Sequence, residues 1–162
     1  MNVRGGEPLP ASNGSPWLLG GGHGSPAEPG SWREPLLTAL RARIEQDLPT
    51  LAICFGFEML AAAAGSELRR LTMPREGEFR LALEREDPLL AGLSGAGTYE
   101  SRSWGVFGDE GCPLAWGREG DVVAARYGPR VFGVIFHPEA LLGPGTAAVY
   151  YTVVPRYLAS LR

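Results

Sequence analysis

The clearest periodic pattern of apolar and polar positions lies in residues 31–47. Its apolar residues return every three or four positions, the spacing of one helix face: Leu36, Leu37, Leu40 and Ile44. Ser31, followed three residues later by Glu34, is typical of a capping box at a helix start. The pattern therefore predicts an amphipathic helix over residues 31–47.

The next apolar run begins after Pro49 and reaches Cys54, as expected of a short strand buried on both faces. Good helix formers follow from Phe57 to Ala64, and Gly65 suits the left-handed conformation that ends many helices. This alternation predicts an α/β fold built on a mostly parallel sheet with helices on both faces.

Beyond residue 65 the pattern favours strands, predicted at residues 78–83, 99–107, 121–127 and 131–136. Gly128 and Pro129 form a turn signal between the last two strands. Residues 145–161 predict a closing helix that Pro155 should kink or divide.

The first 16 residues are rich in Gly, Pro and Ser and are predicted to be irregular. At most one short strand fits near residues 17–19. A chain of 162 residues with 44% hydrophobic composition suits one domain, residues 1–162, with a sizeable core.

Cys54 is the first candidate for chemistry, because it ends an apolar strand and precedes a predicted helix. Ala52 and Gly56, two residues before and after it, are small enough for the sharp strand-to-helix turn that exposes a nucleophile above a sheet. The N–H groups and macrodipole of the helix N-terminus would favour the reactive thiolate.

His137 and Glu139 end the second apolar run. His137 could take the thiol proton, and Glu139 could orient the ring and stabilise its charged form, as in a serine triad. The alternative for each residue alone is structural: a small core cysteine and a strand-end histidine. Their combination in these local contexts favours a catalytic site.

These segments resemble the class I glutamine amidotransferases, whose nucleophile motif reads G-I-C-x-G-H-Q and whose histidine motif reads G-V-Q-F-H-P-E. The chain reads A-I-C-F-G-F-E around Cys54 and G-V-I-F-H-P-E around His137, in the family's order. The resemblance covers about residues 17–161 and implies a flavodoxin-like fold. It also implies Cys54 as nucleophile, His137 as base and Glu139 as its partner, with no cofactor.

Residues 18–26, with the sequence LLGGGHGSP, resemble the family's S-G-G-P-G-S oxyanion loop. By this resemblance the N–H groups of Gly22 and Phe55 would bind the oxyanion, since glycines leave backbone donors unobstructed. A glycine-rich segment could equally be a surface turn or a phosphate-binding loop. His23, within it, is interpreted as a loop residue rather than a catalytic one.

The chain departs from the family at Glu58, where the family's glutamine helps hold the amino-acid end of the substrate. A carboxylate there would repel an α-carboxylate and attract an α-ammonium. The family's H-S-H segment corresponds to residues 99–104, which makes Ser101 and Arg102 candidate substrate-binding residues. Arg102 could pair with a carboxylate of the substrate or of Glu58, or be a solvated charge on a strand.

A second departure lies at the N-terminus, where the family usually has a strand, a helix and another strand before the oxyanion loop. A βαβ unit needs ~30 residues, and only residues 1–17 are available here. We therefore expect the first βαβ unit to be missing, either from a trimmed sheet or from a truncated gene product.

Composition narrows the functional class further. A net charge of -3 argues against nucleic-acid binding, because phosphate contacts need a basic excess, and the arginines of residues 69–85 alternate with glutamates as on a solvated face. No signal peptide or membrane span is visible, so the cytoplasm is the expected location. Two cysteines and two histidines give neither a disulfide framework nor a recognisable metal site.

The leading functional hypothesis is hydrolysis of glutamine, or of a related γ-glutamyl amide, through a Cys54 thioester, with ammonia passed to a partner synthetase. A second hypothesis is a stand-alone γ-glutamyl or amide hydrolase of the same fold. A third, from a different class, is a non-catalytic relative that binds a protein or metabolite. The oligomeric state and the ammonia acceptor have no signal in the sequence.

Overall fold

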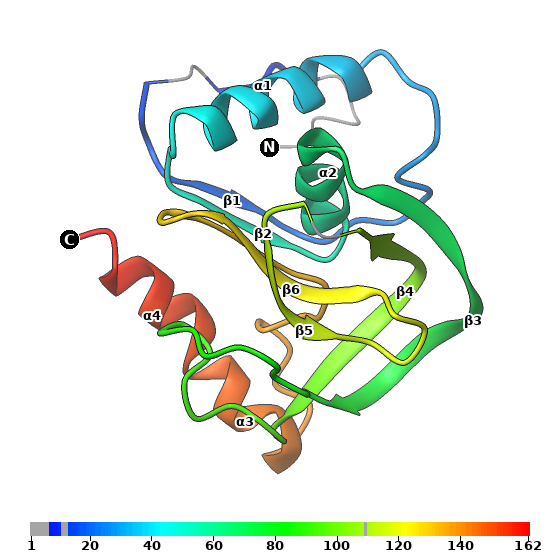
Figure 1. Cartoon of the computed structure of the whole chain (residues 1–162), viewed down its shortest axis with the longest axis vertical. Coiled ribbons are helices and arrows are strands. Elements are labelled where there is room, and N and C mark those ends of the chain that lie inside the picture. Colours follow the sequence, from blue (N-terminus) through cyan, green and yellow to red (C-terminus); the bar gives the residue numbers. More distant parts are fainter. Residues whose placement is uncertain (1–6, 11–12, 109) are drawn as a thin grey trace.

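The computed structural model describes residues 7–10, 13–108 and 110–162. These residues form a curled seven-stranded sheet in the order β1-β2-β7-β6-β4-β3, with β5 beside β6 (Figure 1). The predicted α/β fold is confirmed, but the prediction of a mostly parallel sheet is wrong: β1 pairs with β2, and β2 with β7, in parallel, and the other pairings of the described strands are antiparallel. None of the described helices is long and apolar enough to cross a membrane.

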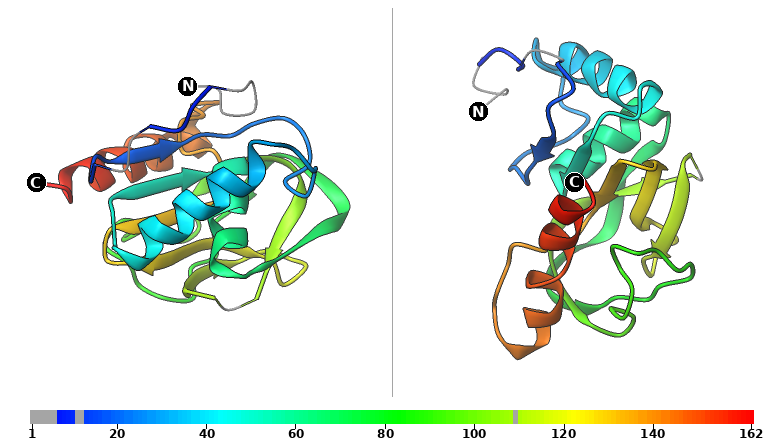
Figure 2. Two further views of the ribbon diagram at one scale, coloured as in Figure 1. Left: turned by 90° about the horizontal axis from the view of Figure 1, so that it is seen from above. Right: turned by 90° about the vertical axis from the view of Figure 1, so that its left-hand side faces the viewer.

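The parallel part contains β1 (Trp17–Leu19), β2 (Thr50–Ile53) and β7 (Val131–Val134). All residues of β2 and β7 are buried, because helices cover both faces of these strands. Helices α1 (Arg33–Glu45) and α2 (Phe55–Ala64) pack together on one face, and α3 (Pro144–Tyr150) and α4 (Val153–Ala159) lie on the other (Figure 2). The carboxyl ends of β2 and β7 thus lie side by side.

The antiparallel part contains β3 (Glu67–Arg80), β4 (Gly97–Phe107), β5 (Cys112–Trp116) and β6 (Val122–Gly128). Strand β3 is much longer than predicted, and β5 was not predicted. Most β3 side chains are exposed, so its arginines and glutamates hide the strand signal. Tertiary pairing with β4 overrides this weak local propensity.

Helix boundaries follow the pattern with small corrections. Helix α1 is capped by Trp32 without a side-chain hydrogen bond, so the predicted Ser31 capping box is wrong: the helix begins too late for Ser31 to reach it. The closing helix is divided as predicted, with the break at residues 151–152 and Pro155 in the first turn of α4.

The N-terminal segment was predicted to be irregular up to residue 16, with a short strand after it. Residues 7–10 and 13–16 form no helix or strand, whereas residues 1–6 and 11–12 lie outside the described part of the chain. The short strand predicted near residues 17–19 is confirmed as β1.

Candidate active site

Cys54 occupies a strained turn between β2 and α2, with φ 52° and ψ -114°. A positive φ at a residue other than glycine costs on the order of 1–3 kcal/mol and persists only where its surroundings impose it. Here the Cys54 N–H donates to Val134 O at 2.9 Å, which fixes the turn against β7. Gly56 is also required, because a Cβ there would lie 2.6 Å from Leu19 O. The structure therefore places the thiol at the helix N-terminus, where the sequence predicts it.

His137 and Glu139 follow β7 and lie beside this turn. The His137 N–H donates to Tyr99 O at 2.8 Å, and its Nδ1 lies 2.8 Å from Glu139 Oε1. Hydrogen bonding to Cys54, and then to Glu139, raises the pKa of His137 to about 10, against the opposing effect of burial. Burial is the largest single effect and would raise the pKa of Glu139, but the hydrogen bond from His137, a backbone hydrogen bond and the charge of His137 together lower it. The hydrogen bonds with Cys54 and Glu139 thus favour the imidazolium form of His137.

Two glycines of the N-terminal loop approach this pair. A Cβ on Gly21 would lie 2.7 Å from His137 Cε1 and 3.5 Å from Cys54 Cβ, so a side chain there would push the ring away. Gly22, chosen from the sequence, lies one residue further on, and its Cβ would lie 3.6 Å from the Phe55 ring. Gly21 was not singled out from the sequence, since nothing in a run of three glycines shows which one meets the histidine.

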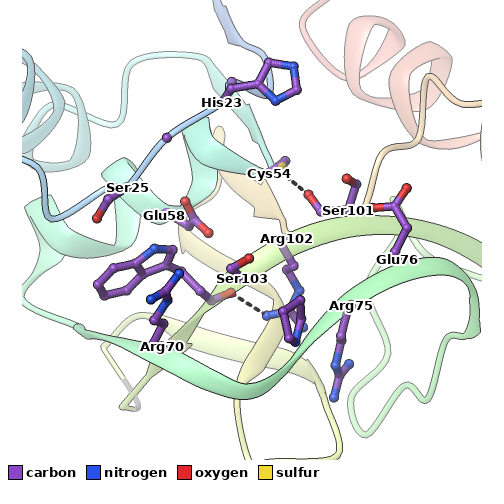
Figure 3. A pocket seen from close by; sticks show the side chains of 14 residues that line it. His23, Ser25, Cys54, Glu58, Arg70, Arg75, Glu76, Ser101, Arg102 and Ser103 are labelled. Atoms are coloured by element: carbon purple, nitrogen blue, oxygen red, sulfur yellow. Dashed lines mark hydrogen bonds between the residues drawn. The ribbon is translucent and has the colours of Figure 1, made fainter.

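A cavity of about 470 Å³ opens beside Cys54, between the glycine loop, α2, β3 and β4 (Figure 3). Its lining includes Gly22, Glu58 and Ser101, as the family resemblance implies. The Cys54 thiol lies 3.9 Å from Ser101 O and can donate to it. His23 lies exposed at the rim of the cavity, consistent with a loop residue.

Glu58 contributes a buried carboxylate to this cavity. The residue is only 3% exposed, and its side chain makes no hydrogen bond or salt bridge with any other described residue. Burial raises the pKa of Glu58 to about 7, and the field of Arg102 opposes that rise. Glu58 thus lines the cavity, and the alternative that it points away to pair with an arginine is wrong.

Arg102 lines the same cavity, but its guanidinium is fully engaged. It donates to Glu100 (2.7 Å), to Asp121 (2.5 Å) and to Trp104 O (2.8 Å). Arg75 approaches the same two carboxylates, at 3.4 and 3.5 Å. These four side chains form a buried cluster of two cations and two anions, so the interpretation of Arg102 as a solvated charge is wrong.

Residues 7–154 match a family model described as "Glutamine amidotransferase class-I". The chain is 33% identical over 119 residues to a glutamine-hydrolyzing GMP synthase of Phenylobacterium zucineum (strain HLK1), a match that covers 68% of the chain and 23% of the relative. It is 34% identical over 95 residues to one subunit of the glutamine-hydrolyzing GMP synthase of Sulfurisphaera tokodaii, a match that covers 56% of the chain and 50% of the relative. The chain thus spans half or less of these relatives' length.

Solved structures agree at the level of the fold. A glutamine amidotransferase from Thermotoga maritima superposes with a TM-score of 0.75 at 17% identity, over 98% of this chain and 70% of that one. A glutamine amidotransferase from Methylobacillus flagellatus gives a TM-score of 0.72 at 21% identity, over 84% of this chain and 57% of that one. Together with the sequence match over most of the chain, this shows that the protein belongs to the class I glutamine amidotransferase family.

Proposed function

We propose that this chain is a glutaminase of the amidotransferase type, with Cys54 as nucleophile, His137 as acid and base, and Glu139 as the partner of His137. The observation that carries the proposal is the strained Cys54 turn, which presents the thiol to a histidine whose Nδ1 is already held by a carboxylate. Either group alone would suit a core residue. Their convergence, with Cys54 lining a cavity, suits nucleophilic catalysis.

In the first half-reaction the thiolate attacks the carboxamide carbon, and a carbon–sulfur bond forms as the carbonyl π electrons move to oxygen. The N–H groups of Gly22 and Phe55 are the proposed donors to this oxyanion, because both residues border the nucleophile turn. The intermediate collapses, the carbon–nitrogen bond breaks, and the His137 imidazolium gives its proton to the leaving nitrogen. Ammonia and a Cys54 thioester result.

In the second half-reaction the neutral His137 takes a proton from water as the water oxygen attacks the thioester. The carbon–sulfur bond then breaks and returns the thiolate beside the imidazolium. The products are a carboxylic acid and the starting enzyme. Every proton is accounted for by His137, and Glu139 keeps the ring oriented throughout.

The fate of the ammonia is the second part of the proposal. The relative from Sulfurisphaera tokodaii and another from Sulfolobus acidocaldarius are each named as one subunit of a glutamine-hydrolyzing GMP synthase. By analogy we assign this chain a synthetase partner that consumes the ammonia. A stand-alone amidase is the competing function, and Glu58 favours it because this position differs from the family motif.

The test uses the two cysteines of the chain, Cys54 and Cys112. Cys54→Ala should abolish ammonia release from glutamine, and a chloroketone analogue of glutamine should add once to wild-type protein, at Cys54 by peptide mass spectrometry. Cys112→Ala is the matched control and should retain both properties. Turnover in Cys54→Ala would refute the mechanism, and ammonia release unaffected by any added synthetase would favour the stand-alone amidase.

A further inference from the structure

The side chain of Tyr99 lies against the His137 ring. The two ring centroids are 6.0 Å apart at an interplanar angle of 52°, a tilted arrangement common among packed aromatic rings. Tyr99 O also accepts the backbone N–H of His137 at 2.8 Å, so β4 contacts both the main chain and the ring of the histidine. Glu139 fixes Nδ1 of this ring, but a single hydrogen bond leaves the ring able to rotate about it. Tyr99 is the aromatic neighbour that can restrict this rotation.

Tyr99 is in turn tied to Glu76 on the neighbouring strand. The Tyr99 hydroxyl donates to Glu76 Oε1, and the Glu76 side chain lies beside that of Ser101, its register partner on β4 (Figure 3). Hydrogen bonds from Ser101 and then from Tyr99 lower the pKa of Glu76, and the bond to Glu76 raises the pKa of Tyr99. The hydroxyl thus keeps its proton while the carboxylate keeps its charge, which makes this contact a charge-assisted hydrogen bond.

Glu76 also brings a negative charge to the His137 side of the cavity. Among the described residues, no arginine forms an ion pair with it. The charge of His137 reaches Glu76 and helps to lower its pKa. Such an interaction between two titrating groups is reciprocal, so Glu76 stabilises the imidazolium in turn. Cys54 and Glu139 are the other titratable groups that act on the ring.

We propose that Tyr99 and Glu76 are positioning residues for His137. Tyr99 holds the ring so that the nitrogen not engaged by Glu139 faces Cys54, and Glu76 anchors the Tyr99 hydroxyl and stabilises the imidazolium. This proposal rests on the proposed function and adds a second carboxylate to its machinery. Both residues act through His137, so their loss should lower kcat rather than raise KM.

The first test is kinetic. Tyr99→Phe keeps the ring and removes its anchor, and Glu76→Gln removes the charge. Each should lower kcat for glutamine about three- to thirtyfold with KM unchanged, because a misoriented proton carrier slows the chemistry and leaves binding intact. The double variant should lose less than the product of the two single losses, since the two residues share one contact.

Glu78→Gln is the matched control. Glu78 is an exposed carboxylate on the same strand and pairs in register with Tyr99, but it does not line the cavity beside Cys54. Its substitution should leave kcat and KM unchanged.

The second test does not depend on turnover. The chain contains two histidines, so their imidazole C–H signals in NMR spectra can be assigned with His23→Gln. Glu76→Gln should lower the pKa of His137 by the equivalent of an about two- to tenfold loss of proton affinity, whereas Glu78→Gln should leave it unchanged.

A rise in KM with unchanged kcat would overturn the proposal, because Glu76 would then be a substrate-binding residue. Equal losses of kcat in Glu76→Gln and Glu78→Gln would overturn it as well. If the wild-type protein releases no ammonia, the proposed function fails, and the titration decides the present proposal by itself: an unmoved pKa of His137 in Glu76→Gln overturns it.

Discussion

The buried carboxylate of Glu58 should make the protein less stable as the pH rises. Its pKa is raised from 4.5 to about 7 in the fold, chiefly by burial. Between these values the folded protein keeps a proton that the unfolded chain has lost, so the free energy of unfolding falls as pH increases and stays low above pH ~7. One unit of pKa corresponds to about 1.36 kcal/mol, so the raised pKa of Glu58 lowers the free energy of unfolding by about 3 kcal/mol once the pH is above both values.

Glu58→Gln removes the titration while keeping the shape of the side chain. The free energies of unfolding of the variant and the wild type can be measured by urea unfolding followed by tryptophan fluorescence. Their difference should change by about 2–3 kcal/mol in favour of the variant as the pH rises from about 5 to 8.5. Any effect of the introduced amide on stability that does not depend on pH cancels when the two pH values are compared. Glu45→Gln, on the exposed end of α1, is the control and should give a gap that does not change with pH. A pH-independent gap for Glu58→Gln would refute the argument that Glu58 is buried without compensation.

Further predictions concern the triad and the loop that faces it. His137→Asn should lower glutamine hydrolysis by the ~10²–10⁴-fold expected of a positioned proton carrier, and a loss of less than tenfold would reassign that role. Glu139→Gln removes a group that raises the pKa of His137, so the decline of kcat/KM at high pH should move to lower pH; an unmoved profile would contradict the pairing. Gly21→Ala should lower kcat at least tenfold without loss of stability, because its methyl group would lie 2.7 Å from His137 Cε1. Gly20→Ala, which meets no atom within 4 Å, is its control, and equal losses in the two variants would point to loop flexibility instead.

The parts of the site that the sequence predicts are those with a local signal. Cys54 requires small neighbours for its turn, and the Gly56 contact with Leu19 shows the packing reason for that requirement. His137 and Glu139 are two residues apart at a strand end, so their hydrogen bond needs little tertiary information. Helix α1 follows from its periodicity, and its Leu36, Leu37 and Leu40 are buried as that pattern implies.

The parts that the sequence does not predict depend on register between distant strands. Arg70 belongs to the mixed-charge stretch interpreted as a solvated face, and its pairing with Trp104 on β4 is what brings it to the cavity. The register between β3 and β4 then shifts between Arg70 and Arg75, which places Arg75 in the buried cluster. Nothing in the spacing of these two arginines reveals that one is exposed and the other buried.

Arg102 illustrates how a neutral cluster still influences the site. Alternation along β4 leaves the Ser101 side chain exposed and buries Arg102, whose guanidinium joins Glu100 and Asp121. Arg102 cannot bind a substrate carboxylate without leaving these partners, yet its field opposes the rise in the pKa of Glu58. Because the cluster carries no net charge, that compensation is incomplete. The pKa of Glu58 therefore stays raised to about 7 despite Arg102, and the buried carboxylate beside the nucleophile turn lowers the stability of the protein once it loses its proton.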